Sequence, residues 1–255
     1  REFFDAIWER NEVTWSSMIN GYMKLGRFRD GLGLFSEMRR EDAVRIEPIL
    51  VTTIFEACGR FDRYTEGCQV HGLVSQLGFE FDVFLGNSLI TMYSRFRCMD
   101  VARSVFDMML EKDIVSWNSL ISGYIQNKDL EEAYGLFEKA PEKDVVSWTT
   151  MITGYSEEGL TEKCIGLFTM MPEKDAIAWT ALISGFVING QYEEAICSFF
   201  QMLQTAVRPN PLTLSSALSA SAGLATLNQG TQIHAQVIKR NMESDLSIQN
   251  TFVSF

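Results

Sequence analysis

Apolar residues in residues 114–144 follow the spacing of α-helices in two successive sets. The first set is Val115, Trp117, Leu120, Ile121 and Tyr124, and the second is Leu130, Ala133, Leu136 and Phe137. Steps of three and four residues place each set on one face of a helix. The polar segment QNKD separates the two sets, and APEKD, with its proline, ends the second. The pattern predicts a helical hairpin, and no alternation of period two is long enough to predict a strand.

The hairpin pattern repeats along the chain. The phrases EKDIVSW, EKDVVSW and EKDAIAW begin at residues 111, 142 and 173, where EK is expected to be a loop that closes one unit. Alignment gives units 12–47, 48–82, 83–113, 114–144, 145–175, 176–210 and 211–245, with partial units at 1–11 and 246–255. Because one hairpin cannot bury its apolar face alone, stacked neighbours should form a single all-α solenoid over residues 1–255. From the partial units we expect both ends to lie inside a longer protein.

Two columns of the alignment predict how the helices pack. Position 20 is small in every complete unit, namely Gly31, Gly67, Ala102, Ala133, Cys164, Ala195 and Gly230, so the two helices of a hairpin should approach closely there. Position 24 is Phe35, Phe106, Phe137, Phe168 and Phe199, with His71 and His234 in the two remaining units. For both histidines we predict packing rather than catalysis. The acidic pairs Glu131/Glu132 and Glu193/Glu194 are expected on the solvated face of second helices.

Composition and charge limit the possible functions. The 255 residues include 22 Lys and Arg against 33 Asp and Glu, a net charge of −11, which argues against binding of polyanions by bulk electrostatics. Five scattered cysteines predict neither a disulfide framework nor a metal site, and favour a reducing compartment. The H-x-E and PCxxC motifs of zinc deaminases are absent, and no apolar run is long enough to span a membrane. We expect no enzymatic activity, cofactor, metal or membrane association here, which leaves open a catalytic domain elsewhere in a longer protein.

The units are similar to the repeats of the pentatricopeptide repeat (PPR) family, in its plant subclass that mixes P, L and S repeats. Units 12–47 and 176–210, the second with WTALISGF and VRPN, resemble P repeats. Units 48–82 and 211–245, the latter opening PLTLSSALSASAGLATLNQGTQIHAQVIK, resemble L repeats. Units 83–113, 114–144 and 145–175, two of which end in PEKD, resemble S repeats. The resemblance covers essentially the whole chain and implies a right-handed α-solenoid superhelix.

In the PPR family each repeat binds one base of single-stranded RNA through its fifth and last residues, while an apolar second residue packs against the base. The resemblance assigns base recognition to Asn87 with Asp113, Asn118 with Asp144, Thr149 with Asp175, and Thr180 with Asn210. Weaker candidates are Thr52 with Asp82, Ser215 with Asp245, Ser16 with Glu47, and Asn250. The base-packing residues would be Val13, Ile49, Phe84, Val115, Val146, Ile177 and Leu212. Helix capping for the polar residues and core packing for the apolar ones are the structural alternatives.

The resemblance also implies a target sequence and a cellular role. In the family Asn with Asp corresponds to U, Thr with Asp to G, and Thr with Asn to A, which gives 5′-UUGA-3′ for the four main pairs. The chemistry is reasonable because the amide of Asn can donate and accept, whereas Asp only accepts. The implied role is site selection for organellar RNA processing, above all C-to-U editing, in the mitochondrion or the chloroplast, with the mitochondrion preferred. Small editing-factor adapter proteins would be partners through the L repeats.

Tetratricopeptide repeats are the nearest alternative to this assignment. They are two-helix solenoids of similar period, but their W-x₂-L-G-x₂-Y pattern is absent from this chain. With that architecture, the function would be a scaffold that binds peptides or adapter proteins. Selection of a preferred RNA sequence would separate the two hypotheses.

Overall fold

The computed structural model describes residues 10–41, 46–76, 78, 82–242 and 244–254. These residues form α-helices joined by turns and contain no strand, which confirms the all-α prediction. The expected partial unit 1–11 lies almost wholly outside them. Within this part of the chain no helix has the length and apolarity needed to cross a membrane. The chain divides into two compact units, residues 1–129 and 130–255.

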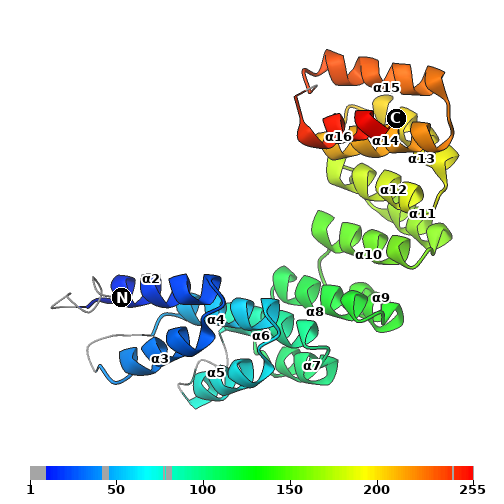
Figure 1. The fold of residues 1–255 in the computed structure, drawn as a ribbon. Coiled ribbons are helices and arrows are strands. Elements are labelled where there is room, and N and C mark those ends of the chain that lie inside the picture. The colour runs from blue at the N-terminus through cyan, green and yellow to red at the C-terminus, as the bar shows by residue number, and fades with distance from the viewer. Residues whose placement is uncertain (1–9, 42–45, 77, 79–81, 243, 255) are drawn as a thin grey trace. The chain divides into compact units, whose positions relative to one another are not determined.

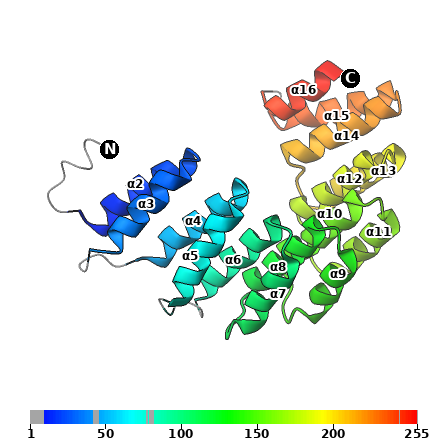
Figure 2. The ribbon, with the colours of Figure 1, turned by 60° about the horizontal axis from the view of Figure 1, so that its bottom comes forward.

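The helices follow the repeat pattern (Figures 1 and 2). The first compact unit contains α2 (Glu12–Lys24), α3 (Phe28–Met38), α4 (Pro48–Arg60), α5 (Tyr64–Gln76), α6 (Val83–Arg95), α7 (Met99–Met108) and α8 (Ile114–Gln126). The second contains α9 (Leu130–Lys139), α10 (Val145–Glu157), α11 (Thr161–Met170), α12 (Ala176–Ile188), α13 (Tyr192–Leu203), α14 (Pro211–Gly223), α15 (Leu227–Lys239) and α16 (Leu246–Ser254). The first helix of every repeat begins at the residue where the aligned repeat begins, from Glu12 in α2 to Leu246 in α16.

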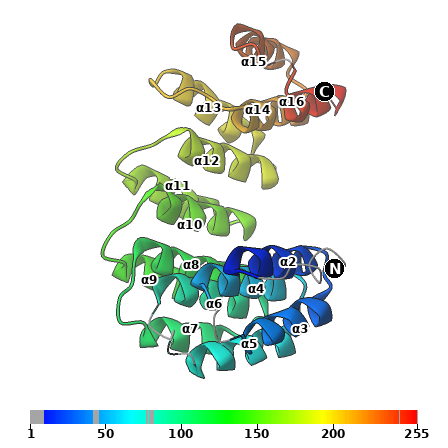
Figure 3. The same cartoon turned by 90° about the vertical axis from the view of Figure 1, so that its left-hand side faces the viewer.

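Within each compact unit the helices form two layers. In the first, α2, α4, α6 and α8 pack side by side in chain order, and α3, α5 and α7 each pack on the first helix of their own repeat. Figure 3 shows α3, α5 and α7 below α2, α4 and α6. In the second, α10, α12, α14 and α16 pack in the same way, and α11, α13 and α15 form the other layer. The first helices therefore make one continuous face in each compact unit.

The residue that ends each hairpin turn, at position 15 of the repeat, has a left-handed backbone. The seven are Gly26, Asp62, Arg97, Lys128, Gly159, Gly190 and Ala225, with φ between 52° and 73°. In each turn the next N–H donates to a carbonyl near the end of the first helix, at 2.8–3.1 Å, as from Thr226 to Ser221. This is the usual way in which a left-handed residue closes a helix. Four of the seven are not glycine, so the turn is strained in more than half of the hairpins.

Replacing Ala225 with glycine should stabilise the protein by about 0.5–1 kcal/mol. A side chain in the left-handed region costs roughly 1–2 kcal/mol, and the greater entropy of an unfolded glycine offsets part of this gain. The midpoint of urea unfolding measures the effect. Ala235→Gly is the matched control, because Ala235 is exposed within the right-handed helix α15 and its loss should cost about 1 kcal/mol. Equal losses in both variants would contradict this account of the turn.

The small residues at position 20 lie in the interior: a Cβ on Gly31 would meet Tyr22 and Met23 of its own hairpin, whereas a Cβ on Gly67 would meet Met92 and Phe96 of the next repeat. All seven are buried, from Gly31 to Gly230, as the alignment predicted. The thiol of Cys164 lies 3.3 Å from the carbonyl oxygen of Ile152 in the facing helix, and burial raises the pKa of that thiol to about 11. Cys164 is therefore protonated and has a packing role.

A second close contact joins successive repeats. A Cβ on Gly123 would lie 2.2 Å from the hydroxyl of Ser94, and a Cβ on Gly185 would lie 2.3 Å from that of Ser156. Beside each glycine an asparagine side chain crosses between the helices, and Nδ2 of Asn189 donates to the carbonyl oxygens of Ser156 and Gly185 at 2.9 and 2.8 Å. Asn127 makes the equivalent bonds to Ser94 and Gly123. These contacts fix the spacing between neighbouring first helices.

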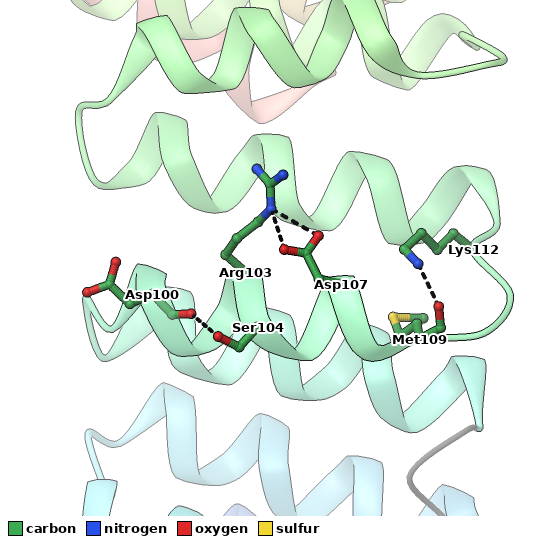
Figure 4. Close-up of polar contacts among 6 residues, drawn as sticks. All are labelled: Asp100, Arg103, Ser104, Asp107, Met109 and Lys112. Carbon is green, nitrogen blue, oxygen red and sulfur yellow. Dashed lines mark hydrogen bonds and ion pairs between the residues drawn. The ribbon is translucent and has the colours of Figure 1, made fainter.

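The repeated phrase EKD also has a structural role at the junction between repeats. The Nζ atoms of Lys112, Lys143 and Lys174 donate to carbonyl oxygens at the end of the preceding helix, in the first case to Met109 (Figure 4). The same three ammonium groups lie 5.2–5.4 Å from the rings of Phe106, Phe137 and Phe168. Each ring meets the next tryptophan edge-on at 4.7–4.9 Å. The lysine is therefore a helix cap and a cation–π partner, and not only a loop residue.

The two histidines at position 24 differ from one another. The Nδ1 atom of half-buried His71 lies 2.8 Å from the hydroxyl of Tyr93, and the two rings pack edge to face. His234 is exposed, so the predicted packing role is wrong for this residue. The acidic pairs in α9 and α13 are exposed, as expected.

Candidate nucleic-acid interface

The apolar second residues of the repeats lie on the surface. Their side chains are 52–75% exposed, and the seven are Val13, Ile49, Phe84, Val115, Val146, Ile177 and Leu212. Other large apolar residues of the same helices, such as Ile54 and Ile90, are completely buried. A single exposed apolar residue needs no explanation, but an exposed apolar column repeated seven times does. The structure excludes core packing for this column.

The last residues of the repeats cap the following first helix. Oδ1 accepts a backbone N–H of the first turn at 2.8–3.0 Å in Asp82, Asp113, Asp144, Asp175, Asn210 and Asp245. Glu47 stands at the cap of α4 without such a side-chain bond, because its carboxylate is one methylene further away. Capping stabilises a helix by about 1 kcal/mol, so it accounts for Asp or Asn at this position whether or not a ligand binds.

Asn11 belongs to the same column and was missed by the sequence analysis. Its Oδ1 accepts the N–H of Thr14 at 2.9 Å at the start of α2. Asn11 is the last residue of the partial unit 1–11, so extension of the alignment by one unit would have identified it.

Four of the eight candidate fifth residues bond to their own helix. The hydroxyls of Thr52, Thr149, Thr180 and Ser215 donate to backbone carbonyls three or four residues earlier. Ser16 and Asn118 are half-buried, and Asn250 is exposed. Asn87 differs, because its Nδ2 donates across the repeat to Oδ1 of Asp113 at 3.2 Å. Its own Oδ1 is buried without a hydrogen-bond partner among the described residues.

A cavity of about 340 Å³ in the first compact unit brings the predicted residues of one repeat together. It is lined by Thr52, Glu56, Phe84, Asn87, Ser88, Thr91, Asp113, Val115 and Ser119. Phe84 and Val115 are the second residues of consecutive repeats, 83–113 and 114–144, and Asn87 and Asp113 are the fifth and last residues of the first of them. Apolar side chains together with an unpaired acceptor suit a flat ring that has a polar edge. A nucleobase has this form.

The carboxylate of Asp113 is a stable hydrogen-bond acceptor. Partial burial by itself raises the pKa of Asp113, but hydrogen bonds from Ser116 and Asn87 outweigh it and hold the pKa below its ordinary value. The stabilisation from these bonds is fully present above the unfolded pKa and is lost as the pH falls through the lowered one. At neutral pH Asp113 therefore accepts and cannot donate.

Basic residues end three successive first helices in the first compact unit. Lys24, Arg60 and Arg95 occupy position 13 of their repeats, in the last turns of α2, α4 and α6, and all three are exposed. The net charge of the chain does not reveal this column, because the column is local to three repeats. In the described helices α10, α12 and α14 the last turn has no basic residue. The first compact unit therefore has cations that can attract phosphate groups beside its helix face.

Comparisons with known proteins give the same family as the motifs. The PPR repeat model matches residues 13–42, 87–114, 115–145, 146–175 and 177–204. A mitochondrial pentatricopeptide repeat-containing protein of Arabidopsis thaliana, At1g53600, is 59% identical over 216 residues, which cover 85% of this chain and 30% of that protein. Another Arabidopsis thaliana member, At2g39620, is 35% identical over 109 residues, or 43% of this chain and 13% of that protein. The chain thus spans less than a third of either relative.

Solved structures show the same fold. The crystal structure of the pentatricopeptide repeat protein PPR10 in complex with an 18-nt psaJ RNA element matches 95% of this chain and 42% of that chain, with a TM-score of 0.61 and 17% identity. A crystal structure of the pentatricopeptide repeat protein PPR10 from maize matches 99% of this chain and 41% of that chain, with a TM-score of 0.57 and 17% identity. The stacked hairpins, the repeat-model matches and the related sequences together show that this chain belongs to the pentatricopeptide repeat family.

Proposed function

We propose that this chain binds single-stranded RNA in a sequence-specific manner, with one repeat for each base. The observation behind the proposal is the cavity that gathers Phe84, Val115, Asn87 and Asp113, four residues to which the family resemblance assigns base contacts. The solved complex of PPR10 with RNA supports the choice of ligand. An exposed apolar column next to polar pairs suits bases that stack on side chains and are recognised at their edges.

The proposed target is 5′-UUGA-3′, for repeats 83–113, 114–144, 145–175 and 176–210. In the first of these repeats Oδ1 of Asn87 is a buried acceptor that has no partner in the part of the chain that the structure describes, and the N3–H of uracil is a donor that can satisfy it. Thr149 and Thr180 have shorter side chains whose hydroxyls bond to their own helix. A shorter fifth residue leaves room for a purine.

The charge distribution bears on how strongly the RNA binds. A net charge of −11 opposes binding of a polyanion, and the basic column Lys24, Arg60 and Arg95 supports it only in the first compact unit. Affinity should therefore fall steeply as salt rises, while base preference should change little, because phosphate contacts position the chain and base contacts specify it.

For the cellular role we propose site selection in organellar RNA processing, in particular C-to-U editing. The order P, L, S, S, S, P, L supports membership of the mixed-repeat subclass, and all five matched segments fall within units assigned to the P and S types. The mitochondrial name of the 59% identical relative favours the mitochondrion. The L repeats are then available to adapter proteins.

Selection from a random RNA pool at near-physiological salt tests the proposal. Enrichment of UUGA in a single register is the expected result. A flat RNA profile together with tight, saturable binding of a peptide library would instead support the scaffold function and overturn the proposal.

Replacing Phe84 with alanine should weaken RNA binding about tenfold while leaving stability nearly unchanged. Phe84 is 75% exposed, and stacking of a base on an aromatic ring is worth about 1–3 kcal/mol. Phe55→Ala is the contrasting variant, because Phe55 is fully buried in α4 and its loss should cost about 3–5 kcal/mol of stability. Titration with UUGA RNA and urea unfolding measure the two effects. Loss of stability in Phe84→Ala would show that the column packs within the protein.

A further inference from the structure

We propose that Thr213, the third residue of repeat 211–245, is a positioning residue that sets the base preference of the repeat before it. This inference rests on the function proposed above. It comes from the hydrogen bonds that Thr213 makes to the fifth and last residues of repeat 176–210, which are Thr180 and Asn210.

The first step concerns the orientation of the Asn210 side chain. The N–H and the hydroxyl of Thr213 both donate to Oδ1 of Asn210, at 2.8 and 2.9 Å, and the N–H of Asn210 donates back to the Thr213 hydroxyl at 3.3 Å. Because a backbone N–H can only donate, the amide atom that faces it must be the oxygen. The Nδ2 group of Asn210 therefore faces away from the helix cap and is presented as a donor.

The second step links Thr213 to the fifth residue. The hydroxyls of Thr213 and Thr180 are 2.6 Å apart, and Thr213 is fully buried. The single proton of the Thr180 hydroxyl is within bonding distance of the Ala176 carbonyl and of the Thr213 hydroxyl, and the Thr213 hydroxyl is within bonding distance of Thr180 and of Oδ1 of Asn210. The Thr213 hydroxyl therefore joins the two residues proposed to contact the base. Thr213 thus holds the pair without touching the base itself.

The third step explains why this orientation matters for Asn and less for Asp. An asparagine that turned over would present an acceptor in place of a donor, whereas the two oxygens of a carboxylate are equivalent. In the first compact unit Ser116 makes the same two bonds to Oδ1 of Asp113, both at 2.8 Å, so Oδ2 remains as an acceptor. N1 of adenine accepts and N1–H of guanine donates. Capping by Oδ1 therefore makes Asn210 select adenine and makes a capping aspartate select guanine.

The experiment compares two variants that remove different parts of Thr213. Thr213→Val keeps the shape and removes the hydroxyl, whereas Thr213→Ser keeps the hydroxyl and removes the methyl group. Binding is measured by fluorescence anisotropy with RNAs that contain 5′-UUGA-3′ or 5′-UUGG-3′, at one stated salt concentration. The ratio of the affinity for 5′-UUGA-3′ to that for 5′-UUGG-3′ should fall about three- to tenfold in Thr213→Val, because the hydroxyl bond to Oδ1 of Asn210 is lost and only the backbone N–H bond still holds the amide. The ratio should be unchanged in Thr213→Ser, which keeps the hydroxyl.

Two further variants separate this inference from the proposed function. Asn210→Asp should change the preferred fourth base of the RNA from A to G. If it does not, the proposal that this repeat recognises a base is wrong. If it does, but Thr213→Val keeps the wild-type ratio or weakens all RNAs equally, only the role of Thr213 is overturned. Ser116→Ala, beside the symmetric carboxylate of Asp113, should change the preference at the first base by at most about twofold. Circular dichroism confirms that each variant is folded.

Discussion

Replacing Asn87 with threonine should change the first base of the preferred RNA from U to G. The variant creates the Thr–Asp pair that repeat 145–175 already has in Thr149 and Asp175. It removes the buried Oδ1 that suits the N3–H of uracil and the bond to Asp113, and it leaves space in the cavity for a purine. Because a matched base is worth about 1–3 kcal/mol, the ratio of affinities for U over G should change about ten- to hundredfold.

Competition binding with UUGA and GUGA RNAs measures this change. Asn228→Thr is the matched control, since Asn228 is exposed in the second helix α15 and its replacement should leave the ratio unaltered. An Asn87→Thr protein that is folded and still prefers U would show that the fifth residue does not select the base. The same result would contradict the assignment of base recognition to the fifth and last residues of the other repeats.

Replacing Gly185 with alanine should destabilise the second compact unit by about 1–3 kcal/mol. The new Cβ would lie 2.3 Å from the buried hydroxyl of Ser156 and 3.1 Å from its Cβ, so α10 and α12 would have to move apart. That movement would stretch the bonds of Asn189 to both helices. Overpacking of this kind outweighs the gain of about 1 kcal/mol that alanine brings to a helix.

Gly166→Ala is the matched control for this prediction. No atom of the described residues lies within 4 Å of a Cβ built on Gly166, which is exposed in α11, so the same substitution should stabilise by about 0.5–1 kcal/mol. Introducing Gly185→Ala into a Ser156→Ala background should recover most of the loss, because the clashing oxygen is gone. Unfolding in urea gives both values. Equal stability changes at Gly185 and Gly166 would sink the idea that this contact sets the helix spacing.

The turns and junctions show how much of the fold is local. The starts of the first helices follow from a residue that caps and an apolar period that begins directly after it, and both can be found within a few residues of sequence. The left-handed residue at position 15 was not predicted, because Asp62, Arg97, Lys128 and Ala225 have no chemical feature in common. Only the closing of a tight hairpin places them in that region of φ.

The repeat period, the all-α class, the starts of the first helices and the family could all be predicted from the sequence. These features depend on contacts between residues close in the chain, and seven repeated units supply the same information many times. Which apolar residues are exposed depends on tertiary contacts. Phe84 and Ile90 belong to the same helix, yet Phe84 is 75% exposed and Ile90 is completely buried. The tertiary structure also brought Asn87 beside Asp113 and Thr180 beside Thr213, across separations of 26 and 33 residues. Contacts between successive hairpins create the cavity and fix the orientation of Asn210, and no local pattern encodes the distance between two helices.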